Sequence, residues 1–357
     1  SRGLGDVYKR QGLTFFSLAL PLKIYPLPKE NKFVSFKHGV ASGDPTQSNI
    51  ILWTKLSDVQ ANTALVTWQI SEYKNFSSLI AQGKTRTDSF KDFTVKVDAK
   101  IPKKYNGLKI YYRFKVGNNI SDIGTTSTLP ITNPEKFNIA FCSCSNYPAG
   151  YFNAYREIAL NKKIDLVLHL GDYLYEYSSD GYASENAQSM GREVFPKNEI
   201  LSLEDYRKRH ATYKKDKDLQ LLHSSKPMIA VWDDHEISND SWKEGAENHS
   251  PDEGSFSKRK EYAIQAYFEW MPIREKNNKK HIITSSIEHK AVLEPIEELK
   301  KQGFDVDIVK VDQSGRVDVN EIKNKLRDDT LLTSIMSVNN ETGVIQPINE
   351  ICEILNN

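Results

Sequence analysis

Three short apolar segments of this chain each end in side chains that commonly bind metals. The segments cover residues 137–141, 164–170 and 228–232, and each has the length and composition of a buried strand. A helix expected over residues 149–160 joins the first two segments into a βαβ unit, whose strands run parallel. Because open parallel sheets bind ligands beyond the carboxyl ends of their strands, the sequence predicts an α/β sheet with one site at that edge.

The side chains that follow these segments make up a candidate metal site. They are Cys144 after the first segment, Asp172 and Tyr175 after the second, and Asp234 and His235 after the third. Carboxylate and phenolate oxygens suit hard cations and a thiolate suits softer ones, so we expect one or two bound ions. Asp172 could bridge two cations about 3.5–4 Å apart. His235 is a candidate to stabilise a transition state or to protonate a leaving alkoxide.

Each of these side chains also has a purely structural alternative. Asp172 could cap a turn at the end of its strand, with Tyr173 and Tyr175 as core aromatics. Cys144 could be a small buried core residue, as free cysteines often are. Asp233 or Asp234 could be the N-cap of a following helix. His169 lies inside a predicted strand, where a hydrogen-bonded core histidine is expected. Metal binding is favoured by the combination of the motifs, because adjacent acids after an apolar strand are unfavourable to bury without a cation.

The pattern of apolar and polar residues changes at two places outside this region. Residues 33–130 contain short β-type segments separated by polar turns, which predicts a small sandwich. Residues 131–275 carry the α/β pattern described above, and proline residues mark the boundary between the two. A stretch rich in lysine and asparagine at residues 276–280 opens a further alternation of strands and helices, which runs to residue 357.

Composition excludes several classes of protein. The 357 residues carry a net charge of +1 without a basic block, so a nucleic-acid partner is not expected. No apolar run reaches the roughly 20 residues of a membrane span. Three cysteines do not make a disulfide scaffold. Residues 12–22 have the length of the apolar region of a signal peptide, and residues 1–11 resemble translated adapter sequence, so residues 1–32 are expected to be a foreign tail with a signal-peptide remnant.

Longer motifs surround the candidate site within residues 33–275. They are Phe36-Lys37-His38-Gly39-Val40-Ala41-Ser42-Gly43-Asp44-Pro45, Ile51-Leu52-Trp53-Thr54, residues 141–146, Tyr151-Phe152-Asn153-Ala154-Tyr155, residues 169–176 and residues 232–239. With these motifs, residues 33–275 resemble the alkaline phosphatase D (PhoD-like) family of metallophosphoesterases. The resemblance implies an exported, periplasmic or secreted, enzyme that hydrolyses small-molecule phosphate mono- and diesters, and we expect a monomer.

The same resemblance implies a role for each residue of the candidate site. Cys144 and Tyr175 would ligate Fe(III), Asp172 would bridge to a Ca(II) ion, and Asp234 would bind that second metal. His235 would act on the phosphate or on the leaving group. Asp233, next to these ligands, would support them from outside the coordination sphere. Members of the family continue past the equivalent of residue 275 with further ligands, commonly in a Gly-Asp-x-His turn, and no such turn occurs in residues 276–357.

Residues 277–357 carry motifs of a different kind. They are Lys280-His281-Ile282-Ile283-Thr284, Glu288-His289-Lys290-Ala291-Val292-Leu293 and Val338-Asn339-Asn340-Glu341-Thr342-Gly343-Val344. This stretch resembles an internal piece of a cysteine desulfurase, a pyridoxal-phosphate enzyme of transaminase fold. The resemblance implies that His289 would stack on the pyridine ring and that Asn339 would contact its phenolic oxygen. The Schiff-base lysine and mobile cysteine of that family fall outside this piece, so bound pyridoxal phosphate is not expected, and Cys352 is expected in a helix core.

Together the two resemblances predict a chimera of the α/β class. Its parts would be an N-terminal all-β immunoglobulin-like sandwich, a truncated metallophosphoesterase α/β domain and a partial α/β transaminase-like segment. The expected function is metal-dependent phosphoester hydrolysis with release of inorganic phosphate, weak or absent in this chain because part of the metal site is missing. The alternatives are a desulfurase fragment and a fragment without catalytic activity.

Overall fold

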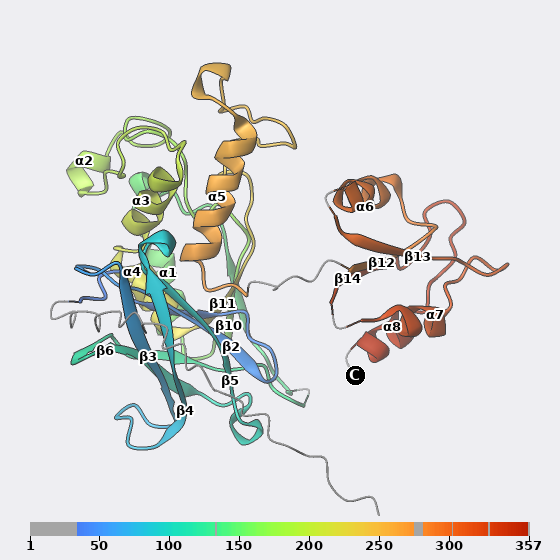
Figure 1. The fold of residues 1–357 in the computed structure, drawn as a ribbon, viewed down its shortest axis with the longest axis horizontal. Coiled ribbons are helices and arrows are strands. Elements are labelled where there is room, and N and C mark those ends of the chain that lie inside the picture. Colours follow the sequence, from blue (N-terminus) through green and yellow to red (C-terminus); the bar gives the residue numbers. More distant parts are fainter. Residues whose placement is uncertain (1–33, 133, 275–280, 302, 328, 356–357) are drawn as a thin grey trace, which may run out of the picture. The chain divides into compact units, whose positions relative to one another are not determined.

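The computed structural model describes residues 34–132, 134–274, 281–301, 303–327 and 329–355 (Figure 1). It divides into two compact units, Ser1–Ile273 and Arg274–Asn357, each of which is described by itself. The foreign tail and the signal-peptide remnant expected over residues 1–32 lie outside the described residues. Among the helices of the described part of the chain, none combines the length and the apolar character that a membrane crossing requires.

The candidate site belongs to a mixed sheet in the first unit. The strand order is β5 (Thr94–Lys100), β2 (Asn49–Lys55), β1 (Val40–Gly43), β11 (Pro227–Ala230), β10 (Leu166–His169) and β9 (Ile139–Cys142). Strands β1, β11, β10 and β9 are parallel to one another, whereas β2 and β5 are added antiparallel. The three strands predicted to lead into the site are therefore neighbours, and their carboxyl ends share one edge, as the sequence predicted.

A second, antiparallel sheet packs on one end of this mixed sheet. Its strands are β4 (Leu79–Asp88), β3 (Thr63–Ser71), β6 (Ile110–Val116), β7 (Asn119–Ile120) and β8 (Gly124–Thr126). Gly117 turns the β6–β7 hairpin with a φ of +55°, a conformation that glycine adopts without strain. Residues from both sheets, among them Val40, Leu52, Val66 and Phe114, share one hydrophobic core.

The predicted immunoglobulin-like sandwich is not confirmed, because one of its two sheets continues beyond residues 33–130 into the α/β region. β1 pairs with β11, with Ser42 opposite Pro227 and Gly43 opposite Met228. The mixed sheet thus contains strands from both the β-rich region and the α/β region. A strand pairing between residues so far apart in sequence leaves no local pattern that could have revealed it.

Helices of the first unit supply a second core around the parallel strands. They are α1 (Asn153–Leu160), α2 (Ala187–Met190), α3 (Leu203–Tyr213), α4 (Lys217–Ser225) and α5 (Phe256–Trp270). Ser202 and Asp205 form a capping box that starts α3, and Asp216 caps α4. The core joins Val167 and Met228 of the sheet to aromatic and aliphatic side chains of α1, α3, α4 and α5. One face of the parallel strands is therefore covered.

The second unit is a smaller α/β segment. Its central strand β12 (His281–Ser285) pairs in parallel with β13 (Asp305–Val309) and β14 (Thr330–Ser334). Its helices are α6 (Lys290–Lys301), α7 (Val319–Lys325) and α8 (Ile348–Leu355). The alternation of strands and helices agrees with the sequence, but a transaminase-like fold is not confirmed by so short a segment. Cys352 is exposed, so its expected place in a helix core was wrong.

Candidate functional site

Backbone hydrogen bonds bring the loops after β9, β10 and β11 together. Cys144 N donates to the Gly171 carbonyl at 3.2 Å, and Ser145 N donates to the Asp172 carbonyl at 2.9 Å. The carboxylate of Glu236 accepts from the backbone N–H groups of Asp172 (3.1 Å), Tyr173 (2.7 Å) and Asp233 (2.9 Å). Burial raises the pKa of Glu236 to about 7, while these three donors act in the opposite direction. Glu236 thus fixes the position of one loop against another.

The backbone at the site adopts conformations that are uncommon for residues with side chains. Cys144 and Asp172 have φ angles of +56° and +52°, in the left-handed region. Gly171 has a φ of +103°, and a Cβ atom there would lie 2.5 Å from Asp233 N. Only glycine permits this approach of two loops. Left-handed non-glycine residues concentrate at functional sites, where surrounding structure holds them in place.

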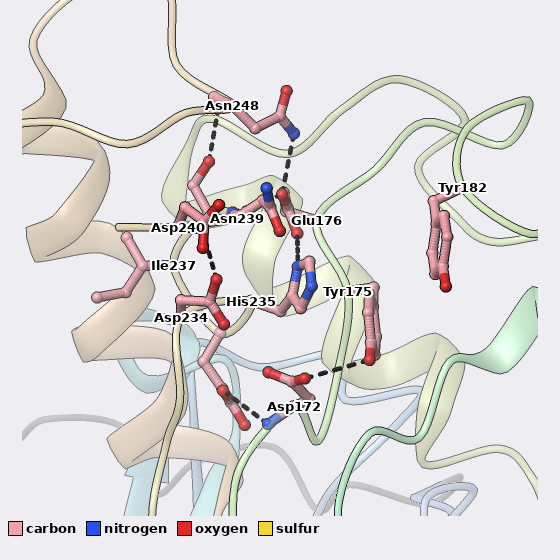
Figure 2. A network of polar contacts seen from close by, with 12 residues as sticks. Asp172, Tyr175, Glu176, Tyr182, Asp234, His235, Ile237, Asn239, Asp240 and Asn248 are labelled. Atoms are coloured by element: carbon pink, nitrogen blue, oxygen red, sulfur yellow. Dashed lines mark hydrogen bonds and ion pairs between the residues drawn. The ribbon is translucent and has the colours of Figure 1, made fainter. Parts of the chain in front are cut away.

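Two carboxylates and an imidazole converge between these loops (Figure 2). Possible ligand atoms of Asp172, Asp234 and His235 all lie within 4.8 Å of one another. Tyr175 donates its hydroxyl to Asp172 Oδ2 at 3.2 Å. Asp172 Oδ1 is buried and makes no hydrogen bond of ordinary geometry with the described residues. Burial raises the pKa of Asp172, whereas the charge of His235 and the neighbouring Cys144 thiol lower it. A buried carboxylate oxygen without a donor fits a cation.

His235 is held by a residue whose role the sequence did not reveal. Its Nδ1 lies 2.8 Å from Glu176 Oε2, so Nε2 is the ring nitrogen available to a ligand. Glu176 is fully buried, and its Oε1 also accepts from Asn239 N at 2.8 Å and Asn248 Nδ2 at 2.9 Å. Burial alone would lower the pKa of His235, but the Glu176 carboxylate raises it overall. The available signal was an acidic residue directly after the motif of residues 171–175.

Cys144 and Tyr175 lie beside Asp172 of this group. The Cys144 thiol is exposed, so it is not the buried core residue of the structural alternative. Burial and then the negative charge of Asp172 raise the pKa of Tyr175, with a further contribution from Cys144. Tyr175 stays protonated in this surrounding unless a cation binds it. Its ring lies against the His235 ring, with centroids 4.1 Å apart.

The remaining residues separate into core and surface positions. Cys142 is half-buried, and burial raises the pKa of its thiol to about 12. His169 is a core histidine, as predicted, with Nε2 2.8 Å from the Tyr155 hydroxyl. Asp234 does not cap a helix: its carbonyl accepts from the backbone of residues 237 and 238 in a turn, and its Oδ2 accepts from Asp240 N. Asp233 is exposed and lies outside the cluster.

A cavity elsewhere in the first unit does not coincide with this cluster. It has a volume of about 400 Å³ and lies beside α1, lined by residues that include Glu157, Leu160 and Ile164. None of its lining residues belongs to the group of Asp172, Asp234 and His235. Its single acid, Glu157, is solvent-exposed. The chemistry of the donor set, rather than the presence of a deep pocket, therefore identifies the candidate site.

The two residues proposed to contact pyridoxal phosphate have structural partners in the second unit. His289 is exposed, and its Nδ1 accepts from Ala291 N at 3.1 Å at the start of α6. Asn339 is buried, and its Oδ1 accepts from Glu341 N at 3.1 Å and Thr342 N at 2.8 Å. Its Nδ2 donates to the Ile287 carbonyl at 3.0 Å. The Asn339 amide thus joins two loops of this unit.

Asn339→Ala is expected to destabilise the second unit by about 1–3 kcal/mol, because it removes the three hydrogen bonds that this buried amide makes to the backbone of residues 287, 341 and 342. The neighbouring Asn340 is exposed, and Asn340→Ala is expected to change stability by less than about 0.5 kcal/mol. Hydrogen exchange of the amides in residues 281–355, followed by mass spectrometry on the full chain, measures the difference. Equal protection in the two variants would show that Asn339 does not hold these loops together.

Comparison with known proteins assigns the two units to different families. Residues 24–130 match the family described as PhoD-like phosphatase, N-terminal domain, and residues 139–292 match PhoD-like phosphatase. Residues 263–357 match aminotransferase class-V. Alkaline phosphatase D of Bacillus subtilis (strain 168) is 34% identical over 280 residues, which cover 74% of this chain and 45% of that protein.

Two further relatives agree with this division. A solved structure described as "Structure of PhoD" superposes with a TM-score of 0.62 at 35% identity, covering 68% of this chain and 47% of that one. Cysteine desulfurase IscS 1 of Archaeoglobus fulgidus is 52% identical over 77 residues, which cover 22% of this chain and 20% of that protein. The chain thus spans less than half of its phosphatase relative and about a fifth of the desulfurase. PhoD-like phosphatase domains therefore make up most of this chain, and a C-terminal aminotransferase class-V segment, similar to cysteine desulfurases, follows them.

Proposed function

We propose that the first unit binds Fe(III) and Ca(II) and hydrolyses small phosphate mono- and diesters to release inorganic phosphate. The observation that carries the proposal is the buried Asp172 Oδ1, which accepts no hydrogen bond of ordinary geometry from the described residues and lies with Asp234 and His235 in a group of three possible ligands. The similarity to alkaline phosphatase D supports the reaction class. The family resemblance also suggests an exported parent enzyme, and we propose that it acts as a monomer.

Each residue of the cluster has a chemical role in this proposal. Cys144 and Tyr175 would hold iron, Asp172 would bridge the two cations, and Asp234 would hold calcium. The cations, when bound, supply Lewis-acid stabilisation of the charge that develops on the phosphoryl oxygens. His235 faces the same space with Nε2 and can hold a proton there for the leaving alkoxide.

Glu176 positions His235 for this step. It fixes the ring through Nδ1 at 2.8 Å and favours the protonated imidazole, which is the form that can donate. We further propose that turnover is weak in this chain, because the cluster of Asp172, Asp234 and His235 offers few carboxylates for two cations. No catalytic role is proposed for the second unit, since the Asn339 amide is already engaged with its own backbone.

The direct test of this site uses the colour of iron bound to tyrosinate. The purified chain, reconstituted with Fe(III), is expected to absorb visible light by charge transfer from Tyr175, and Tyr175→Phe is expected to abolish this band. Tyr182 is the matched control, because its ring stacks at 6.4 Å from the Tyr175 ring while 64% of the residue is exposed. Tyr182→Phe should keep the band. A band that survives in Tyr175→Phe, or iron that does not bind at all, would reject the assignment.

A further inference from the structure

Three tyrosine rings border the candidate site on one side. Tyr175 lies against His235, and the Tyr177 ring lies 5.5 Å from the same imidazole, measured between ring centroids. The Tyr182 ring is 6.4 Å from that of Tyr175 and 5.9 Å from that of Tyr177. Figure 2 shows Tyr182 beyond Tyr175 as seen from His235, with the two tyrosine rings nearly parallel. We call Tyr177 and Tyr182 the tyrosine pair, since no metal-binding role is proposed for either of them.

The loop that carries Tyr182 is tied to the site and to Tyr177. Asn146, in the loop after β9, donates from Nδ2 to the Tyr182 carbonyl at 3.1 Å. A Cβ atom at Gly181 would lie 2.7 Å from Tyr177 Cβ, so a side chain there would push the loop away from Tyr177. Ser184 Oγ donates to the Gly181 carbonyl at 2.7 Å. These contacts fix the two rings of the tyrosine pair relative to each other.

The tyrosine pair offers an accessible aromatic surface next to the buried ligands. Tyr182 is 64% exposed and Tyr177 is half-buried, whereas Tyr175 is 7% exposed. Tyrosine presents a large, rigid contact area at a low conformational cost. The rings of Tyr182 and Tyr177 are inclined by only 22° and 26° to that of Tyr175. Such a near-parallel set of rings favours a further planar ring, which gains attraction by offset stacking.

Charge near the tyrosine pair restricts the kind of group that can bind. The carboxylates of Glu176, Asp234 and Glu247 act on the Tyr177 hydroxyl. Asn239 joins two of them, because its backbone N–H donates to Glu176 at 2.8 Å and its Nδ2 donates to Glu247 at 2.7 Å. A second anionic group on the substrate would be repelled by these carboxylates. The surroundings of the pair therefore suit an uncharged ring.

We propose that the tyrosine pair binds an uncharged aromatic leaving group, so that phosphate esters of aromatic alcohols are the substrate class that this site prefers. The inference rests on the proposed function, in which His235 provides the proton for the leaving oxygen. Because Tyr177 lies beside His235 and Tyr182 lies beside Tyr177, the group bonded to that oxygen meets these two rings in turn. Tyr182 would contact the leaving group alone, which makes it a specificity-determining residue.

Calorimetric titration of the full chain, reconstituted with Fe(III) and Ca(II), tests the proposal without requiring turnover. The probes are phenylphosphonate and methylphosphonate, which carry the same anionic head group and are not hydrolysed. We expect phenylphosphonate to bind more tightly than methylphosphonate to the unsubstituted chain. Tyr182→Ala is expected to weaken phenylphosphonate about three- to tenfold and to leave methylphosphonate unchanged, because only the phenyl ring reaches the missing side chain.

Two further variants separate stacking from a change in the loop. Tyr182→Phe keeps the ring and is expected to bind phenylphosphonate as the unsubstituted chain does. Tyr73→Ala is the matched control, since Tyr73 is 51% exposed in the same unit and lies between β3 and β4. It should leave the binding of both probes unchanged. The bond from Asn146 ends on the backbone carbonyl of Tyr182, so it remains possible in every variant.

Several results would overturn the proposal. One is an equal loss of both probes in Tyr182→Ala, and another is a loss of phenylphosphonate in Tyr182→Phe. If Tyr182→Ala weakens cyclohexylphosphonate or 2-aminoethylphosphonate as much as phenylphosphonate, the pair recognises apolar or cationic groups instead of aromatic ones. If iron binds but phenylphosphonate has no advantage over methylphosphonate, the inference fails while the proposed function stands. A chain that binds no iron rejects both.

Discussion

Asp172→Asn is expected to remove nearly all bound iron from the purified chain and to abolish any hydrolysis of p-nitrophenyl phosphate. The substitution keeps the size of the side chain but replaces an anionic ligand by a neutral amide. Changes to residues that only support metal ligands reduce affinity about 10–100-fold, so loss of a bridging carboxylate should exceed about 100-fold. Elemental analysis and calorimetric titration with Fe(III) and Ca(II) measure the change.

The same substitution should act differently on the metal-free chain. Burial raises the pKa of Asp172, so its carboxylate is less stable in the folded chain than in the unfolded one. For a carboxyl group with a raised folded pKa, stabilisation is present below the unfolded pKa and is lost as the pH rises through the folded value. At neutral pH, Asp172→Asn is therefore expected to leave the free energy of unfolding unchanged or higher.

Asp233→Asn is the matched control for both measurements. Asp233 lies near Asp234 in sequence but is exposed and outside the cluster. Because its side chain is exposed and lies outside this group, we expect this variant to retain the metal content of the unsubstituted chain, contrary to the supporting role that the family resemblance implied for Asp233. If both variants bind iron equally well, or if Asp172→Asn unfolds the metal-free chain, the cluster is a structural carboxylate group and not a metal site.

Lys214→Met is expected to stabilise the first unit by roughly 2–5 kcal/mol at pH 7. This range follows from the lowered pKa of Lys214, because each pKa unit corresponds to about 1.4 kcal/mol. Lys214 is 1% exposed and pairs with no carboxylate among the described residues. Its Nζ donates to the Tyr173 hydroxyl at 3.1 Å and lies 3.2 Å from His223 Nε2 and 4.5 Å from the centre of the Trp53 ring. Burial lowers the pKa of Lys214 from 10.5 to about 7.

The sign of the pH dependence follows from this direction. Between the folded pKa of about 7 and the unfolded value of 10.5, the unfolded chain binds a proton that the folded chain releases. The free energy of unfolding therefore rises as the pH increases through this window. This gain in stability is lost as the pH falls towards 7. Methionine fills a similar volume without a charge and should remove this slope. The pair of Tyr173 and His223, 2.8 Å apart, remains in the variant.

Urea unfolding at pH 7, 8.5 and 10 measures both the gain and the slope. Lys215→Met is the control, because Lys215 is the adjacent lysine and is exposed. We expect the control to match the unsubstituted chain within about 0.5 kcal/mol. A loss of stability in Lys214→Met, with the pH slope retained, would mean that Lys214 is charged and favourably solvated inside the fold.

The sequence predicted best what depends on local pattern and on strand ends. Cys144, Asp172 and Asp234 each follow an apolar run, and parallel strands necessarily bring such positions to one edge. The sequence could not assign Glu176 or Glu236, because each acts on groups about 60 residues away through bonds that only the fold creates. The immunoglobulin-like sandwich is not confirmed for a similar reason. Short strands and turns show that a sheet exists, but they do not show which distant strand completes it.

The pairing of β1 with β11 has a consequence for how proteins of this architecture can exchange parts. Strand Val40–Gly43 is hydrogen-bonded to strand Pro227–Ala230, although the matched families divide between residues 130 and 139. A recombination event at that division would give each product half of a sheet and an unpaired interior strand edge. The inherited partner would then have to match its new neighbour in register, apolar faces and twist. Each family region that the sequence reveals therefore supplies only part of a sheet, and the complete sheet needs both regions.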